Sequence, residues 1–436
     1  MWLAGVGFFA DAYDLFVTNL ILVILDAIYS AKPSDLALVS SAGLAGTIVG
    51  QIGFGFLGDF IGTTTAWILT VCLIILGCLF SAFLSFGSFV FVLLSFWRFI
   101  LGLGIGGEYP LAATVSREAS HESHGVSRVA LVFSAQGWGN LAAPLVILIL
   151  ISILPETSLG LQLVWRLAVL FGVIPCIYVF LGRLRVFNQA QGGSNERITP
   201  SWDFVQTSVQ QNLWRLLWTA GTWFIFDVVF YANGLFSATV LSLLKFETNQ
   251  GIHGKLKDLS IESLCIAGMG LPGYFLAVYI IDRVGKVNLQ RAGFLILSFI
   301  YLLMGIFLDS LEKHRLLFIC LYGLTFFVSN MGPNTTTFVI PTEAFPSESR
   351  ATCHGISAAS GKLGAVFGSV MFPLVLHTEN GIRWGLICCG IICLGGYALS
   401  STTWISNSPI NVHSKLEEEE LSLQDLSPSD DQPLQI

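Results

Sequence analysis

Charged residues are scarce in this sequence. Asp, Glu, Lys and Arg make up 11% of the 436 residues, whereas hydrophobic residues make up 54%. Soluble globular domains contain roughly a quarter charged residues, so the composition excludes that class and indicates a protein that crosses the lipid bilayer several times. The net charge of -7 comes largely from the acidic residues near the carboxy-terminus and gives no information about a charged partner. We expect no nucleic-acid partner.

The usual signatures of catalytic, metal and cofactor sites are missing as well. The nine cysteines lie mostly in apolar stretches and show neither metal-ligand nor redox spacing. No Ser/His/Asp set stands outside the apolar stretches. The glycine-rich stretch 102–107 follows no strand, as a nucleotide-binding loop would. We therefore expect no metal, no cofactor and no enzymatic activity.

Long apolar stretches dominate what is present. Each has about the 20 residues that a helix needs to cross a bilayer. They lie at 2–29, 35–58, 66–86, 88–115, 127–153 and 163–182, and then at 213–242, 260–282, 291–309, 315–340, 352–376 and 383–405. The sequence therefore predicts an all-α membrane protein with twelve transmembrane helices. The first stretch contains Asp11, Asp14 and Asp26 and lacks a basic leader, so we expect a span and not a cleaved signal peptide.

A polar break divides the chain into two halves. We expect an amino-terminal six-helix bundle at 1–182, a linker at 183–212 that includes Arg183 and Arg185, and a carboxy-terminal six-helix bundle at 213–405. Residues 406–436 are rich in Asp and Glu and are expected to form a disordered tail. Loops on the side of the two termini contain slightly more Lys and Arg, which places the termini, the linker and the tail in the cytoplasm. The plasma membrane is the expected location.

The two halves repeat each other. Shifting the chain by 216 positions aligns the stretch around Asp227 with the stretch around Asp11, including the preceding glycine and phenylalanine. A second alignment, further along, sets Glu108 opposite Asn334 and Gln136 opposite Lys362. Parallel six-helix repeats of this kind predict pseudo-symmetric bundles with a substrate site between them, exposed to each side in turn.

The stretch around Asp227 contains the strongest candidate site. Trp223, Asp227 and Tyr231 recur every four residues and therefore share one face of a helix. A carboxylate in the hydrocarbon core costs several kcal/mol or more, by roughly any scale, unless it faces a cavity or a partner. We interpret this face as a wall of the substrate site.

Four further polar residues in apolar stretches are substrate-site candidates, and three of them have a plainer alternative. Tyr109 precedes Pro110, which can open the backbone hydrogen-bond ladder. Gln136 could simply bond a neighbouring helix. Asn334 lies in a glycosylation sequon, although its apolar surroundings argue against modification. Lys362 could extend to the membrane interface or point inward as a positive charge.

Three acids are candidates for proton coupling. Asp11 and Asp14 are three residues apart and lie on one face of the first helix. Two buried carboxylates near each other suit a site that must load and release a proton near neutral pH. Glu108 could take part in the same route, or it could be a loop-end acid at the membrane surface. The plainer alternative for Asp11 is a helix-entry position, but its alignment with Asp227 argues against it.

The candidate substrate residues favour a small oxyanion. Hydrogen-bond donors with one fixed positive charge, Lys362, can bind such an anion and also release it. Asp227 repels a fully ionised anion such as sulfate but can accept a hydrogen bond from the P–OH of protonated phosphate. Phosphate therefore fits these residues better than sulfate does.

Several of these stretches resemble the phosphate:proton symporters of the major facilitator superfamily, with the plant and fungal inorganic phosphate transporters as the nearest likeness. The resemblance covers essentially all twelve expected helices and is carried by the stretches 5–16, 104–112, 332–338 and 352–362. It implies a phosphate site at Tyr109, Gln136, Trp223, Asp227, Tyr231, Asn334 and Lys362, and a proton route through Asp11 and position 108. Position 108 is Glu where the family usually has Asp.

Two alternatives remain open from the sequence. Relatives that transport glycerophosphodiesters or other organic anions share much of this pattern, and Glu108 keeps that function possible. A phosphate-sensing receptor, with the acidic tail as its output, is a different class. Inorganic phosphate and protons are the partners expected of the leading interpretation, a proton-coupled phosphate importer.

Overall fold

The computed structural model describes residues 1–119, 125–191, 202–242, 251–311, 313–376, 378 and 380–402. The predicted tail at 406–436 and part of the predicted linker lie outside the described residues. The described chain is built from α-helices and short 3-10 turns, and twelve helical segments in it are long and apolar enough to cross a membrane. The prediction of twelve spans is confirmed, and the protein is an integral membrane protein.

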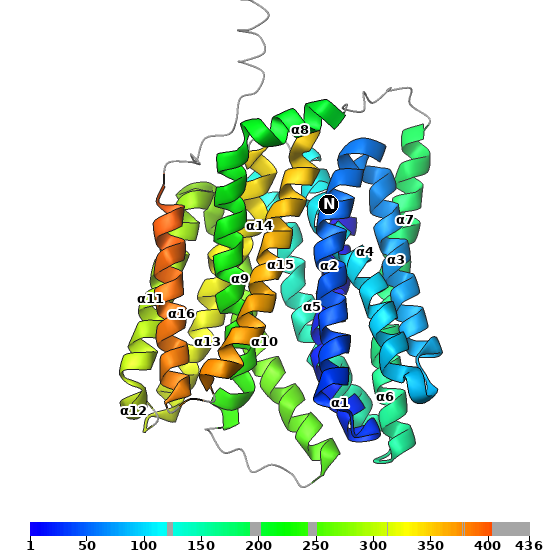
Figure 1. Cartoon of the computed structure of the whole chain (residues 1–436), viewed down its shortest axis with the longest axis vertical. Coiled ribbons are helices and arrows are strands. Elements are labelled where there is room, and N and C mark those ends of the chain that lie inside the picture. Colours follow the sequence, from blue (N-terminus) through cyan, green and yellow to red (C-terminus); the bar gives the residue numbers. More distant parts are fainter. Residues whose placement is uncertain are drawn as a thin grey trace, which may run out of the picture.

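The first six spans form one half of the molecule, on the right in Figure 1. Five of them are single helices, and the sixth consists of α6 and α7, which meet at Gly172. The helices are α1 (Trp2–Tyr29), α2 (Pro33–Ile61), α3 (Thr63–Leu84), α4 (Val90–Glu118), α5 (Gly125–Ile153), α6 (Ser158–Phe171) and α7 (Val173–Gln191), with a 3-10 turn η1 (Gly87–Phe89) before α4.

The second six spans form the other half, on the left in Figure 1, after the short helix α8 that lies across one end of the bundle. The helices are α8 (Trp202–Gln211), α9 (Leu213–Ser242), α10 (Ile252–Val284), α11 (Lys286–Ile306), α12 (Leu308–Leu311), α13 (Arg315–Met331), α14 (Pro333–Ala344), α15 (Arg350–Leu376) and α16 (Gly381–Ser400), with a 3-10 turn η3 (Ser347–Ser349) before α15. We call the end of the bundle that carries α8 the α8 end.

The predicted linker differs from the structure at its start. Residues 183–191 continue α7, and residues 202–211 form α8. Arg183 is buried inside the amino-terminal half, whereas Arg185 is exposed. The first residues of the polar break therefore belong to the sixth span, because two arginines interrupt the hydropathy of that helix without ending it.

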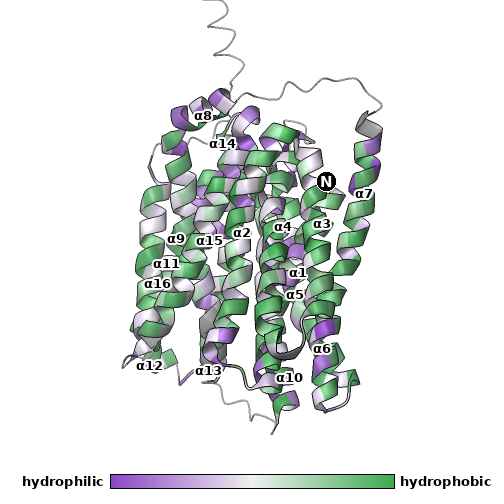
Figure 2. Ribbon diagram, turned by 45° about the vertical axis from the view of Figure 1, so that its right-hand side comes forward, coloured by the Kyte–Doolittle hydropathy of each residue, from purple (hydrophilic) through white to green (hydrophobic). Residues whose placement is uncertain are grey.

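Apolar side chains cover the outside of the molecule. Many large hydrophobic residues are exposed, and the ribbon in Figure 2 is coloured mostly as hydrophobic along the sides, with more hydrophilic residues near the ends, including α8. Buried polar residues lie inside, in contacts within and between the halves. This distribution is expected for a bundle whose outer surface faces lipid, since polar groups in hydrocarbon must find partners inside the protein.

The two halves meet along two helix pairs, α2 with α15 and α5 with α10. At the α8 end, both carboxylate oxygens of Asp59 on α2 accept hydrogen bonds from the first turn of α15, with Thr352 N at 2.8 Å and Ala351 N at 3.2 Å. A carboxylate satisfies the free amide groups of a helix start. Arg117 on α4 also pairs with Glu343 on α14, at 3.3 Å. These contacts join the halves at the α8 end.

Candidate functional site

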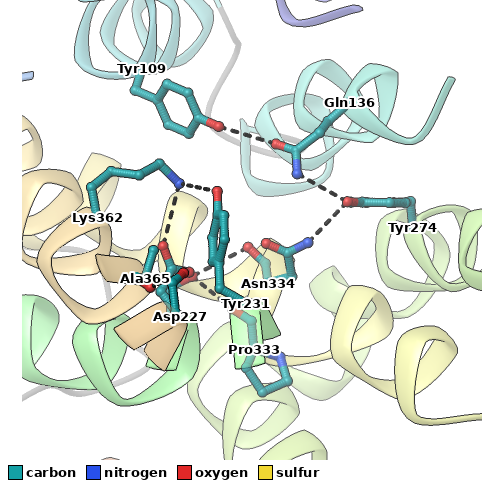
Figure 3. Close-up of polar contacts among 11 residues, drawn as sticks. Tyr109, Gln136, Asp227, Tyr231, Tyr274, Pro333, Asn334, Lys362 and Ala365 are labelled. Atoms are coloured by element: carbon teal, nitrogen blue, oxygen red, sulfur yellow. Dashed lines mark hydrogen bonds and ion pairs between the residues drawn. The ribbon is translucent and has the colours of Figure 1, made fainter. Parts of the chain in front are cut away.

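Two of the predicted substrate residues meet on α9 and are joined by a third from α15. Lys362 Nζ donates a hydrogen bond to Tyr231 Oη at 3.0 Å and lies 3.4 Å from Asp227 Oδ2 (Figure 3). Asp227 is 3% exposed and Lys362 is 4% exposed. The sequence left two positions open for Lys362, at the membrane interface or in the interior. The structure places it in the interior. A buried cation with a buried carboxylate avoids the cost of an isolated charge.

Glycines on α15 bring these residues together. A side chain at Gly364 would meet the backbone of Phe224 on α9 at 3.0 Å, and one at Gly368 would meet the backbone of Val228 at 3.1 Å. Both glycines therefore permit close approach of α15 to α9, as small residues do between membrane helices. Lys362 lies half a turn before Gly364 and is brought beside Asp227 by this packing.

A chain of neutral polar groups crosses from one half to the other. Tyr109 Oη on α4 donates to Gln136 Oε1 on α5 at 3.4 Å, and Gln136 Nε2 donates to Tyr274 Oη on α10 at 3.2 Å. Asn334 Nδ2 donates to the same Tyr274 oxygen at 2.9 Å (Figure 3). Three predicted residues are therefore connected, and the residue that connects them, Tyr274, is one that the sequence reasoning missed.

The tenth span is interrupted just before Asn334. Helix α13 ends at Met331 and α14 begins at Pro333, which has no amide hydrogen to continue the ladder. Asn334 follows at once, and its Nδ2 also donates to Asn330 Oδ1 at 2.8 Å. Polar groups at a broken membrane helix are typical of transporter binding sites.

Trp223 takes part in aromatic ring contacts, and among the described residues its side chain forms no ion pair of the kind that Asp227 forms with Lys362. Its ring centroid lies 6.5 Å from that of Tyr109 and 5.7 Å from that of His354. A side chain at Gly361 would lie 2.7 Å from its indole nitrogen. Trp223 therefore packs against α15 and lies near Tyr109 of the amino-terminal half, and its role in substrate binding stays a prediction.

The polar contacts of Glu108 lie within the amino-terminal half. The guanidinium of Arg183 forms two hydrogen bonds with its carboxylate, at 2.5 and 2.6 Å. Trp67 Nε1 donates to Oε2 at 2.9 Å, and Thr70 Oγ1 donates to Oε1 at 2.5 Å. Glu108 and Arg183 are both 1% exposed, so the alternative of a loop-end acid at the membrane surface is wrong.

The other two predicted proton-coupling acids differ from Glu108. Both oxygens of Asp11 are buried, and no hydrogen-bond partner reaches them among the described residues. Asp14 accepts a hydrogen bond from Cys78 Sγ at 3.4 Å, and its backbone oxygen accepts one from Arg98, also at 3.4 Å. The two acids share helix α1, and both are buried.

Tyr274, Arg183 and Arg98 are not among the substrate-site or proton-coupling residues predicted from the sequence. Arg98 and Arg183 are charged residues in or beside apolar stretches, so the cost of burying them could have marked them. Tyr274 follows the only proline of α10, Pro272, by two residues. An interrupted apolar helix is a known sign of a binding site, but a tyrosine has no charge to distinguish it from packing aromatics.

Comparison with known proteins decides the family. The model of the Major Facilitator Superfamily matches residues 4–369. The chain is a member of this superfamily. It is 33% identical to the low affinity inorganic phosphate transporter 1 of Petunia hybrida, over 89% of this chain and 87% of the relative. It is also 33% identical to the inorganic phosphate transporter 1-1 of Arabidopsis thaliana, over 89% of each. Within the superfamily, the protein belongs to the family of these transporters.

Solved structures have the same fold. The proton:xylose symporter XylE, bound to 6-bromo-6-deoxy-D-glucose, matches with a TM-score of 0.74 at 17% identity, over 95% of this chain and 98% of that one. The E. coli fucose:proton symporter FucP matches with a TM-score of 0.67 at 15% identity, over 92% and 98%. The predicted major facilitator fold is confirmed, and the family is one of transporters and not of enzymes.

Proposed function

We propose that this protein imports inorganic phosphate together with protons by alternating access. The observation that carries the proposal is the cluster formed by the buried Lys362 and Asp227 with the partly buried Tyr231, at the seam between the halves. Lys362 Nζ lies 5.5 Å from the ring centroid of Tyr109, which belongs to the amino-terminal half. The names of the 33% identical relatives support inorganic phosphate as the substrate.

The cluster has the chemistry that a protonated phosphate needs. Lys362 can pair with the charged oxygens, and the hydroxyl groups of Tyr109 and Tyr231 can donate to them. Asp227 can accept a hydrogen bond from a P–OH group. Tyr274 accepts two hydrogen bonds, so its hydroxyl hydrogen remains as a donor. Sulfate has no such hydrogen at neutral pH and would be repelled by Asp227.

We assign the α8 end to the cytoplasm and the membrane to the plasma membrane. The excess of Lys and Arg in the loops at this end supports the orientation. With the halves joined there by Asp59 and by the Arg117–Glu343 pair, phosphate would enter from outside. A proton taken up by the acids of the amino-terminal half would reduce their repulsion of the anion and favour the rearrangement that opens the α8 end.

Among the residues that the structure describes, no contact favours the organic phosphodiesters. That alternative rests on Glu108, and both oxygens of Glu108 accept hydrogen bonds from Arg183, Trp67 and Thr70. The longer side chain of this glutamate is thus used inside the amino-terminal half. Competition experiments still separate the two substrates directly.

Uptake of radiolabelled phosphate into proteoliposomes tests the proposal. An inwardly directed proton gradient should drive uptake, and neither sulfate nor glycerophosphocholine should compete. Lys362→Met should abolish uptake, whereas Arg185→Met, which changes an exposed cation, should not. Phosphate binding without uptake would favour a receptor, and gradient-driven uptake of glycerophosphocholine would favour the organic phosphodiesters.

A further inference from the structure

The buried charges of the amino-terminal half are unequal in number. They comprise three acids, Asp11, Asp14 and Glu108, and two arginines, Arg98 and Arg183. In the other half, Asp227 and Lys362 balance each other at the candidate site. One negative charge of the amino-terminal half is therefore left over in the interior, and a single proton would neutralise it.

The contacts of Glu108 indicate that it does not take this proton. Its carboxylate accepts four hydrogen bonds, from two nitrogens of Arg183, from Trp67 and from Thr70. The guanidinium also donates to Trp67 O at 2.6 Å and lies 3.8 Å from the centroid of the Trp67 ring. A carboxylate with every acceptor position used by donors is held in its ionised form, because a proton would displace one of them.

Asp11 lies next to this pair without such partners. On α1, Gly7 precedes Asp11 by one turn and so lies on the same face. A side chain at Gly7 would lie 3.0 Å from Arg183 Nη2 and 3.1 Å from Glu108 Oε2. The ion pair therefore packs directly on the face of α1 that carries Asp11, and Asp11 is the acid of this face to which no described residue donates.

We infer that Arg183 is a positioning residue that holds Glu108 ionised and thereby restricts proton exchange in the amino-terminal half to one proton, on Asp11. The inference rests on the proposed proton coupling. Uptake of the proton forms one O–H bond on the Asp11 carboxylate, and release breaks it. The titratable groups that interact electrostatically with Asp11 include Asp14 on α1, Glu108 and Tyr109 on α4, and Arg183 and Cys176 on α7.

Adjacent residues on α4 link this site to the substrate. Glu108 points to Arg183, and the next residue, Tyr109, reaches Gln136 and the neighbourhood of Lys362. A change in the charge around Asp11 can therefore affect both Glu108 and Tyr109, which are adjacent on α4. Arg183, on α7, holds Glu108 in place. Its other polar contacts are with Trp67 and Thr70, which are not candidate substrate residues.

The test measures the number of protons moved per phosphate in proteoliposomes, from the membrane voltage at which net phosphate flux reverses at a fixed proton gradient. Arg183→Met leaves Glu108 without its counter-ion, so two acids then need neutralising and the proton number should rise by one. Arg183→Lys keeps the charge and should keep the wild-type number. Arg185→Met is the control for an exposed arginine on the same helix.

Glu108→Gln gives an independent test, because it frees Arg183 to pair with Asp11. Phosphate flux should then lose its dependence on the proton gradient. Arg183→Met combined with Glu108→Gln removes both charges and should restore that dependence. A merely structural ion pair would lower the amount of folded protein in each variant and leave the proton number unchanged.

An unchanged proton number in folded Arg183→Met would overturn the inference, as would a Glu108→Gln variant that remains fully coupled. Absence of gradient-driven phosphate uptake by the wild-type protein would instead overturn the proposed function. The two failures are therefore distinguishable in the same set of measurements.

Discussion

At the scale of single residues, Asp227 is the acid that we propose to contact the substrate. Its carboxylate lies 3.4 Å from Lys362 Nζ, and the lysine also bonds Tyr231. Asp227 and Lys362 therefore balance each other in the structure, and we propose that both contact phosphate when it binds. In this proposal, the carboxylate of Asp227 alone accounts for selectivity against sulfate.

Replacing Asp227 with Asn tests this assignment. The variant replaces the charged acceptor of the P–OH group with a neutral amide oxygen, which weakens a hydrogen bond worth about 1.5–3 kcal/mol, so phosphate affinity should fall by up to about 100-fold. Sulfate should become a competitor in the uptake assay. Asp203→Asn, at an exposed aspartate of α8, is the control, and a variant that binds phosphate normally and still excludes sulfate would contradict the assignment.

Tyr274 offers a second test at this scale. Tyr274→Phe keeps the ring but removes the oxygen that accepts from Gln136 and Asn334. The variant also lacks the hydroxyl hydrogen proposed to donate to phosphate, and a hydrogen bond to a charged group is worth about 1.5–3 kcal/mol, so the KM for phosphate should rise about 10- to 100-fold. The matched control is Tyr279→Phe on the same helix, where the ring is exposed. An unchanged KM would exclude Tyr274 from the site.

At the scale of helices, packing of α15 on α9 sets the position of Lys362. Gly364→Val would push a branched side chain against the backbone of Phe224, and overpacking of this kind costs about 1–3 kcal/mol. The melting temperature in detergent should fall, together with phosphate uptake. Gly395→Ala, where a side chain meets nothing within 4 Å, should leave both unchanged. A normal melting temperature for Gly364→Val would show that α15 does not need this close approach.

The sequence predicted the helices well and the contacts between them less well. Hydropathy located all twelve spans, because a span must be apolar over its whole length. The period of four on α9 placed Asp227 and Tyr231 on one face, and the structure brings Lys362 to that face. The partner of Glu108 could not be found in this way, because Arg183 is 75 residues away and no local pattern links them.

At the scale of the whole molecule, the contacts at the α8 end hold the halves together. Asp59 on α2 caps α15 across the seam, at 2.8 Å from Thr352 N. A helix cap contributes about 0.5–2 kcal/mol, which is enough to shift a balance between two arrangements several-fold. Alternating access requires that such contacts break once in each cycle.

Asp59→Ala should therefore expose residues that the closed α8 end covers. Cys353 on α15 is fully buried and follows Thr352 in the chain. We expect a water-soluble maleimide to label Cys353 several-fold faster in the variant, as measured by mass spectrometry of the labelled peptide. Asp35→Ala, in the first turn at the opposite end of α2, is the control. Equal labelling rates would mean that Asp59 does not hold this end closed.

The central claim is that phosphate and protons cross the membrane together. The most direct measurement adds phosphate outside proteoliposomes that enclose a pH-sensitive dye, with no gradient imposed beforehand. The account predicts that phosphate acidifies the interior, that sulfate does not, and that Asp11→Asn abolishes the response. Entry of radiolabelled phosphate with no change in the internal pH, once buffering by phosphate itself is subtracted, would contradict it.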